Sequence, residues 1–284
     1  MGTGPLGHRL HEVSDIGLSR MAACDTHRPM EDKPAKLSDS TKPLDEIFQS
    51  SSGVAGLRFV NEDILQYNLH ELDFDGCEFA GCVFDESTIR GSRFVACRFN
   101  KCDFKETTFS NCRFGEGNEA SACIWTHCNL AEAKFEDCNL GLNKFVKCSA
   151  YMAAFRKCAA SGLQFEAEVH KKISARLVMG GVHFEECKLQ YAAFREKNYS
   201  ESKFEKCDLR DVSFWRSDLT NCSFAGSALN NVDFDQAVLD RASLVHATFD
   251  EFKLDGMASY AGMFVSREQQ EVILRSMGIV VVGK

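Results

Sequence analysis

Proline and long apolar runs are the features this 284-residue sequence has least of. All four prolines lie at or before Pro43, and the rest of the chain has none. Because proline lacks a backbone N–H, its absence after residue 43 is compatible with a long, continuous backbone ladder there. No run of 18 apolar residues occurs and the N-terminal residues show no apolar signal-peptide core, so we expect no membrane span.

Motifs for common chemistry are also missing. The sequence has no Cys-x-x-Cys pair, no glycine-rich nucleotide motif and no serine nucleophile elbow, and its eight histidines are scattered. The formal net charge is −8 with a pI of about 5.6, which argues against direct nucleic-acid binding. The sequence therefore predicts a protein that is not an enzyme and that holds no metal or cofactor.

Aromatic residues, in contrast, are abundant and regularly spaced. Twenty of the 23 phenylalanines fall on a five-residue grid that has 36 slots in three runs, and none of the slots holds a charged residue. The runs extend from Phe59 to Phe114, from Trp125 to Phe165 and from Phe184 to Leu254. A fixed short period of this kind indicates a repeat architecture.

A second column lies two residues before each slot and explains the cysteines. Thirteen of the 14 cysteines occupy it, and only Cys24 does not. The thirteen are Cys77, Cys82, Cys97, Cys102, Cys112, Cys123, Cys128, Cys138, Cys148, Cys158, Cys187, Cys207 and Cys222. Residues i and i−2 share one face of an extended segment, so both columns are expected to point inward.

A period of five fits neither a helix, at 3.6 residues, nor a plain strand, at 2. It fits a coil with flat sides and regular corners, with one pentapeptide on each side. The slot then takes a large apolar side chain and the second column a small one, while the charged and polar residues between them face solvent.

The repeat resembles that of the pentapeptide-repeat family over about residues 55–256. Local examples are Ala133-Lys-Phe135, Cys207-Asp-Leu209 and Ala237-Val-Leu239. The resemblance implies an all-β solenoid, a right-handed quadrilateral β-helix with four pentapeptides per coil. Thirty-six slots then give about nine coils, or a rod of roughly 45 Å at a rise of ~4.8 Å per coil.

We interpret the cysteines as packing. Pairs 20 residues apart, such as Cys77 and Cys97 or Cys138 and Cys158, are expected to stack in adjacent coils. A buried thiol behaves as a small hydrophobic group, and a cytosolic chain keeps its thiols reduced. Disulfides remain the alternative, and zinc is disfavoured because one inward column offers no tetrahedral cage.

The breaks in the grid divide the chain into three predicted parts. Residues 1–52 are expected to form a disordered or flexible tail, in which a short helix over Leu44 to Gln49 covers the first coil; the tail is equally compatible with targeting or export. The β-helix is expected over 53–256, with loops at 115–122 and 166–181. The second loop is a candidate partner-binding loop or a plain solvated bulge, and its candidate residues are His170, Lys171, Lys172, Arg176, Leu177 and Met179.

The last part, 257–284, is predicted to contain a capping or dimerisation helix and a short strand. Ser266 and Gln269 have the spacing of a capping box, which predicts a helix from about Arg267 to Met277 that ends at Gly278. Ile279 to Val282 has the composition of a strand. The helix either closes the solenoid or meets its own copy in a two-fold homodimer. Its candidate residues are Val272, Ile273, Leu274 and Met277.

Two functions fit these features. The loops and the C-terminal ending resemble the quinolone-resistance members of the family, which implies a cytoplasmic acidic DNA mimic that protects DNA gyrase or topoisomerase IV, both type II topoisomerases. Its candidate acidic face is Asp233, Asp235, Asp240, Asp250 and Glu251. The alternative is a protein-interaction scaffold or secreted effector that uses the N-terminal tail for targeting.

Overall fold

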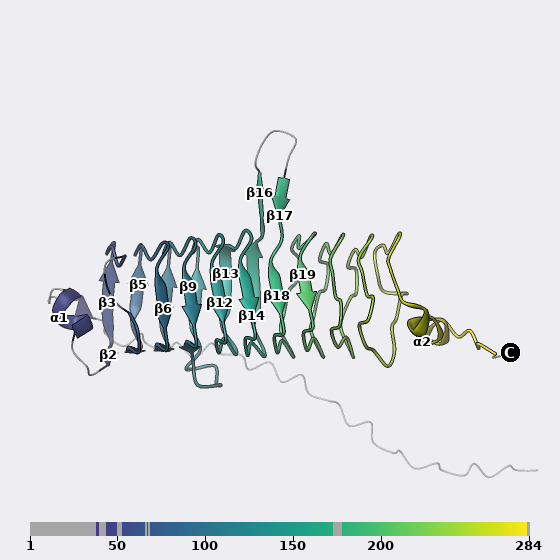
Figure 1. Ribbon diagram of the computed structural model, residues 1–284, viewed down its shortest axis with the longest axis horizontal. Helices are drawn as coiled ribbons and strands as arrows, with labels where there is room; N and C mark the ends of the chain where they lie inside the picture. The colour runs from purple at the N-terminus through teal and green to yellow at the C-terminus, as the bar shows by residue number, and fades with distance from the viewer. Residues whose placement is uncertain are drawn as a thin grey trace, which may run out of the picture. The chain divides into compact units, whose positions relative to one another are not determined.

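The computed structural model describes residues 38–39, 44–49, 53–65, 67, 69–172 and 178–282, all within one compact unit, 35–284. In this part the chain winds into stacked coils, and each coil pairs in parallel with the next (Figure 1). The fold is a parallel β-solenoid with a short C-terminal helix. Arg176 and Leu177, and most of the predicted tail 1–52, lie outside the described residues.

Each coil has four sides, which we call faces 1 to 4 in chain order. Three faces are sheets, of seven, six and four strands, and face 2 is a ladder of single bridges such as Asp63↔Val83 and Val83↔Asp103. Face 1 contains β1 (Ser38–Asp39), β3 (Leu57–Val60), β5 (Glu78–Ala80), β8 (Arg98–Asn100), β11 (Ile124–Thr126), β13 (Lys144–Ser149) and β15 (Gln164–Glu168).

Face 3 contains β6 (Thr88–Arg90), β9 (Thr108–Ser110), β12 (Lys134–Glu136), β14 (Ala154–Arg156), β18 (His183–Glu185) and β19 (Lys203–Glu205). Face 4 contains β2 (Val54–Ala55), β4 (Asp73–Asp75), β7 (Arg93–Val95) and β10 (Arg113–Phe114). Beyond its seven strands face 1 continues through the single bridges Gln164↔Ala193, Ala193↔Ser213 and Ser213↔Asp233. Regular strands therefore cover less of the chain than the repeat does.

The two predicted columns form the core. Every predicted slot residue except Leu254 is buried, and so are all thirteen second-column cysteines, which are free thiols. Rings stack between coils, as for Phe79 and Phe99 at 5.2 Å and 12°, and meet edge to face within a coil, as for Phe79 and Phe84 at 5.7 Å and 66°. Both are favoured ring geometries.

The second column also supplies hydrogen-bond donors. The Cys97 thiol donates to the Phe74 carbonyl at 3.5 Å, and Thr107 Oγ1 donates to the Phe84 carbonyl at 2.7 Å. Ser217 and Ser227 make the same contact to Phe194 and Phe204. The column therefore accepts a thiol or a hydroxyl, because each satisfies a buried carbonyl of the preceding coil.

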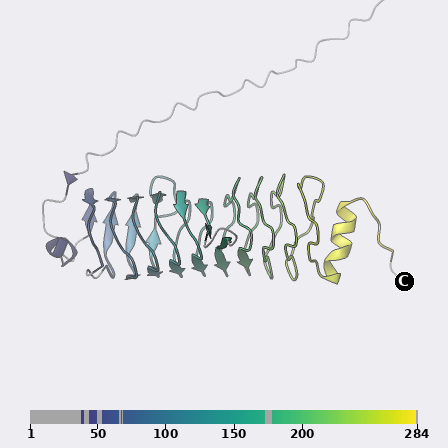
Figure 2. The ribbon, with the colours of Figure 1, turned by 90° about the horizontal axis from the view of Figure 1, so that it is seen from above.

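Helices close both ends of the solenoid (Figure 2). At the start, α1 (Leu44–Gln49) lies where the sequence predicts it, with Phe48 5.9 Å from the Phe59 ring and 5.3 Å from that of Tyr67. At the other end the 3₁₀ turn η1 (Arg267–Gln269) leads into α2 (Gln270–Ser276), and the predicted capping box is present. Gly278 has φ 78°, as expected of the residue that ends a helix.

Three details differ from the sequence prediction. Phe252 rather than Leu254 is buried against Phe234, because residues 250–255 leave the ladder. The coil then continues past 256 one residue out of phase, with the bridges Val238↔Ser259 and Ser243↔Phe264. Residues 279–282 form no strand, since the described part of the chain offers them no pairing partner.

Candidate functional site

The predicted loop 166–181 is a projecting hairpin. Its strands β16 (His170–Lys172) and β17 (Val178–Gly180) pair antiparallel and extend away from the coils (Figure 1). The loop is shorter than predicted, because residues 166–168 continue β15, and Ala167 and Val169 are fully buried in the core. The hairpin therefore begins at His170.

Contacts at its base hold the hairpin against the solenoid. His170 Nε2 lies 3.0 Å from the Ser200 carbonyl oxygen and 3.1 Å from Ser200 Oγ. The Lys171 ammonium lies 5.8 Å from the centre of the Tyr151 ring. Lys172 and Met179 are exposed, so the hairpin presents both positive charge and an apolar side chain.

Two glycines allow this close approach. A Cβ on Gly180 would collide with the backbone of Val169 and would lie 2.6 Å from His170 Cα. Gly181 has φ +112°, and a Cβ there would lie 2.9 Å from the Glu201 carbonyl oxygen. Neither site can take a side chain without moving backbone.

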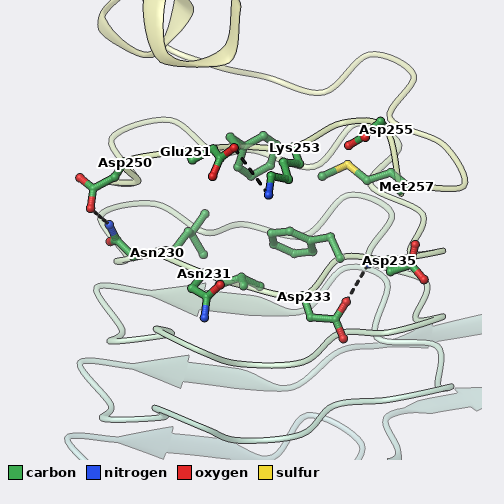
Figure 3. A pocket seen from close by; sticks show the side chains of 14 residues that line it. Asn230, Asn231, Asp233, Asp235, Asp250, Glu251, Lys253, Asp255 and Met257 are labelled. Atoms are coloured by element: carbon green, nitrogen blue, oxygen red, sulfur yellow. Dashed lines mark hydrogen bonds and ion pairs between the residues drawn. The ribbon is translucent and has the colours of Figure 1, made fainter. Parts of the chain in front are cut away.

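The predicted acidic face is partly gathered around a hollow of about 470 Å³ between residues 229–235 and 250–257 (Figure 3). Asp233, Asp235, Asp250 and Glu251 line it, together with Asp255 and Lys253. Asp240 is not part of it. Instead, Asp240 accepts hydrogen bonds from Ser259 and from the Ala261 N–H, which lower its pKa.

The hollow exists because two backbone contacts between coils are missing. In the preceding coil Asp211 N–H donates to Asn230 and Phe214 N–H donates to Asp233. Among the described residues no equivalent bond joins Asn231 or Phe234 to residues 250–255, and the ladder resumes at Gln236 with Gly256. The walls are fixed by local bonds, such as Ser213 to Asp233 at 2.7 Å and Asn230 to Asp250 at 2.6 Å.

A second group of acidic residues, which sequence reasoning missed, follows face 2. We call it the face 2 stripe; it consists of Asp63, Asp85, Glu86, Asp103, Glu106 and Glu132. Its members occupy outward positions beside the face 2 slots Ile64, Phe84, Phe104 and Leu130 in successive coils. Lys105 lies among them, 2.7 Å from Glu106. Each face receives every fourth pentapeptide, so grouping the charged residues by face reveals the stripe. A sum of charges along the sequence mixes the four faces and does not show it.

Asp85 and Asp103 are the most closely packed members of the stripe. Both accept the Lys105 N–H, at 2.9 and 3.2 Å. Partial burial, and then the neighbouring Asp103, raise the pKa of Asp85 to about 6. The crowding of carboxylates on this face therefore opposes the ionisation of Asp85.

The predicted C-terminal helix residues divide into two sets. Val272 and Ile273 pack against the core, beside the buried Gln269, whose amide donates to the Leu244 and Ala247 carbonyls at 2.7 Å each. Met277 is exposed, as are Ile279, Val280, Val281 and Val282. One side of this end closes the solenoid and the other leaves apolar surface uncovered.

The chemistry available at these sites is limited. Within the described ranges no three His, Cys, Asp or Glu side chains gather as metal ligands. Ser200 and His170 are close enough for a nucleophile and a base, but the same His170 nitrogen also contacts the Ser200 carbonyl oxygen. The acid-lined hollow lies elsewhere, at residues 229–257, so it could not hold a substrate against this pair. The pair serves to anchor the hairpin.

Two segments of the chain match models of pentapeptide repeats, residues 74–118 as nine copies and residues 217–256 as eight. Both segments fall within the four-sided coils. The chain is a pentapeptide-repeat protein. No curated protein sequence matches it significantly.

Solved pentapeptide-repeat structures share this fold. Trypsin-treated QnrB1, a plasmid-mediated fluoroquinolone resistance protein, superposes with a TM-score of 0.65 at 20% identity, over 80% of this chain and 99% of QnrB1. Full-length QnrB1 gives 0.54 at 21% identity, over 80% and 100%. HetL from the cyanobacterium Nostoc sp. strain PCC 7120, which is involved in heterocyst differentiation regulation, gives 0.54 at 15% identity, over 75% and 84%. None of the helices described in this pentapeptide-repeat protein has the length and hydropathy needed to cross a membrane.

Proposed function

We propose that this protein is a non-catalytic, protein-binding rod that protects a type II topoisomerase, DNA gyrase or topoisomerase IV, by presenting its acidic face 2 in place of DNA. The observation that carries the proposal is one continuous corner of the solenoid. The backbone N–H groups of Glu86, Glu106 and Glu132 each donate to a carbonyl of the next coil along this corner, the last of these coils being the one that contains Met152. The Met152 N–H then donates to the Gly181 carbonyl at 3.0 Å. The face 2 stripe thus leads directly to the base of the hairpin.

The spacing of the charges supports mimicry of DNA. Six carboxylates and Lys105 over four coils at a rise of ~4.8 Å give roughly one net negative charge per 4 Å. One strand of DNA carries a charge about every 3.4 Å, so the stripe offers a basic saddle a similar charge density. The hairpin adds a contact of different chemistry, in which Lys171, Lys172 and Met179 meet a mixed surface of the same partner.

The choice of target rests on likeness to QnrB1, a fluoroquinolone resistance protein whose chain is covered almost completely. Under this proposal the protein acts in the cytoplasm, where topoisomerases work. We also propose that it forms a two-fold dimer through Leu274, Met277 and residues 279–282, the apolar surface that its own core leaves uncovered. A Met277→Glu variant should sediment as a monomer if this surface forms the dimer.

The test measures gyrase supercoiling at a fixed inhibitory fluoroquinolone concentration with added purified protein. We expect micromolar protein to restore supercoiling. A stripe variant, Asp63→Asn, Glu86→Gln, Glu106→Gln and Glu132→Gln, should need ~10-fold more protein. The control variant Asp73→Asn, Asp75→Asn, Glu136→Gln and Asp137→Asn removes as many exposed acids from faces 3 and 4 and should act like the wild type. Unchanged inhibition with all three proteins would contradict the proposal.

A second function is favoured by the hairpin alone. A projecting hairpin that combines positive charge with an exposed apolar side chain suits a protein-interaction scaffold that recognises some other partner, including a secreted effector. Affinity capture with intact protein and with a variant in which residues 170–180 are replaced by Gly-Ser distinguishes the two. Recovery of gyrase subunits supports topoisomerase protection, and hairpin-dependent recovery of a different protein supports the scaffold.

A further inference from the structure

Twelve of the buried cysteines are arranged as continuous columns of thiols. The first column runs down face 1, the second down face 2 and the third down face 4. Their members are Cys77, Cys97 and Cys123; Cys82, Cys102, Cys128 and Cys148; and Cys112, Cys138, Cys158, Cys187 and Cys207. All are at most 2% exposed. Cys222, on face 3, is buried but has Ser202 and Ala242 at the equivalent positions of the adjacent coils.

Successive thiols in a column face each other directly. The strand register places Glu78 opposite Arg98 and Arg98 opposite Ile124, so the preceding residues Cys77, Cys97 and Cys123 are also in line. Each thiol donates to a carbonyl of the preceding coil, as Cys77 does to Val54 at 3.3 Å and Cys123 to Phe94 at 3.4 Å. The thiols of one column therefore stack one above another in successive coils.

The rise of the coil decides what can form between two such sulfurs. A disulfide needs Cβ atoms about 3.5–4.5 Å apart, but parallel side chains on neighbouring coils are separated by ~4.8 Å. Two metal–thiolate bonds of about 2.3 Å in line span roughly 4.6 Å, which matches the rise. The columns are therefore better spaced for a linear sulfur–metal–sulfur bridge than for a sulfur–sulfur bond.

The apolar core also restricts the charge of any complex. The slots around the columns hold no charged residue, so a complex with net charge would be strongly penalised. A divalent ion between two thiolates is neutral, whereas four thiolates around zinc would carry two negative charges. No group of three or more ligands exists in the described residues either, which leaves two-coordinate binding.

We propose that consecutive cysteines of each column bind a soft divalent d10 ion in linear two-coordinate geometry between adjacent coils, with mercuric ion as the representative ligand. In the reaction two S–H bonds break, two metal–sulfur bonds form and two protons pass to solvent, with no change in oxidation state. Soft thiolates favour such ions.

The columns predict a stoichiometry. Pairs that share no thiol give one, two and two sites in columns of three, four and five. The test titrates mercuric chloride into full-length Cys24→Ser protein with excess glutathione, which removes ions held by a single thiol. Native mass spectrometry counts bound ions, X-ray absorption reports the number of sulfur ligands, and far-ultraviolet circular dichroism reports the fold. We expect saturation at about five ions, two sulfurs per ion and a retained fold.

Matched variants distinguish an ion bound between two paired thiols from an ion bound to any single thiol. Cys97→Ser breaks both pairs of the first column and should lower the stoichiometry by one ion. Cys77→Ser leaves Cys97 and Cys123 paired, and Cys222→Ser removes an unpaired thiol, so both should leave the stoichiometry unchanged. Serine already occupies second-column positions at Ser217 and Ser227, so these variants should fold. Equal losses in all three variants, one sulfur per ion, or loss of the solenoid on loading would overturn the proposal.

Discussion

Trp125 and Asn143 lie in adjacent coils of face 1, and the Trp125 indole N–H donates to Asn143 Oδ1 at 3.1 Å inside the core. Trp125 fills a slot held by phenylalanine in the coils on either side, Phe99 and Phe145. Asn143 occupies the second-column position at which the preceding coil has a cysteine, and its amide donates to the Phe114 and Gly141 carbonyls. The two residues that depart from the repeat thus compensate each other, because each satisfies a hydrogen bond of the other.

We expect Asn143→Leu to destabilise the protein by about 2–3 kcal/mol, because the indole N–H and two carbonyls lose their partners in a dry core. Trp125→Phe with Asn143→Cys restores the pairing found in the other coils and should recover most of the loss. Urea unfolding of Trp125→Phe, of Asn143→Cys and of the double variant measures the coupling. Additive effects of the two single changes would show that the residues act independently.

The repeat in the sequence was sufficient to predict the fold and the core. The slot residues, such as Phe59, and the second-column cysteines, such as Cys97, are buried as predicted, because a coil with one pentapeptide on each side keeps both columns inside. The interruptions at Gly115 and after Phe165 also lie where the grid breaks. The resemblance supplied the four-sided cross-section, which periodicity alone does not.

The remaining details depend on contacts that no periodic pattern contains. Phe252 displaces Leu254 from the core because residues 250–255 leave the ladder, and the grid has no signal for such a departure. Val169 continues the core into the segment predicted as a loop, because a one-residue register shift between β13 and β15 places Val169, and not His170, at the face 2 slot. A strand at 279–282 requires a partner strand, and composition cannot supply one.

The acidic pair in the face 2 stripe should make stability depend on pH. Because the pKa of Asp85 is raised to about 6 in the folded state, from an unfolded value near 3.9, its contribution to stability is full below pH 4 and is lost as pH rises through 6. Solvent screens this half-buried group, so we expect a loss of at most about 1 kcal/mol.

Two variants test that dependence by urea unfolding from pH 4 to 7. Asp85→Asn should remove this component and stabilise the protein at pH 7. Asp103→Asn removes the neighbouring carboxylate, so it should shift the component to lower pH rather than abolish it. If wild type and Asp85→Asn lose stability in parallel between pH 4 and 6, the crowding of these two groups has no energetic consequence.

The hairpin should be sensitive to a single methyl group at its base. In Gly180→Ala the new Cβ meets the backbone of Val169 and His170, which cannot move without unpairing β16 from β17. We expect tryptic cleavage after Lys171 and Lys172 to accelerate by ~10-fold as the hairpin opens. Gly141→Ala is the matched control, since its Cβ would make ordinary contacts of 3.4 and 3.6 Å. Equal cleavage rates in the two variants would show that the glycine is not required.

Gln269 should be the residue that keeps the last coil closed. Its amide group donates to the Leu244 and Ala247 carbonyls, and its Oε1 accepts the Ser266 N–H at 2.7 Å. Gln269→Leu keeps the apolar volume but leaves these buried groups without partners, at a cost of about 2–3 kcal/mol. Hydrogen exchange should then accelerate in residues 237–249, while the coils near Phe99 stay protected, because each coil contacts only its neighbours. The exposed neighbour Gln270, changed to alanine, should leave exchange at both places as it is in the wild type.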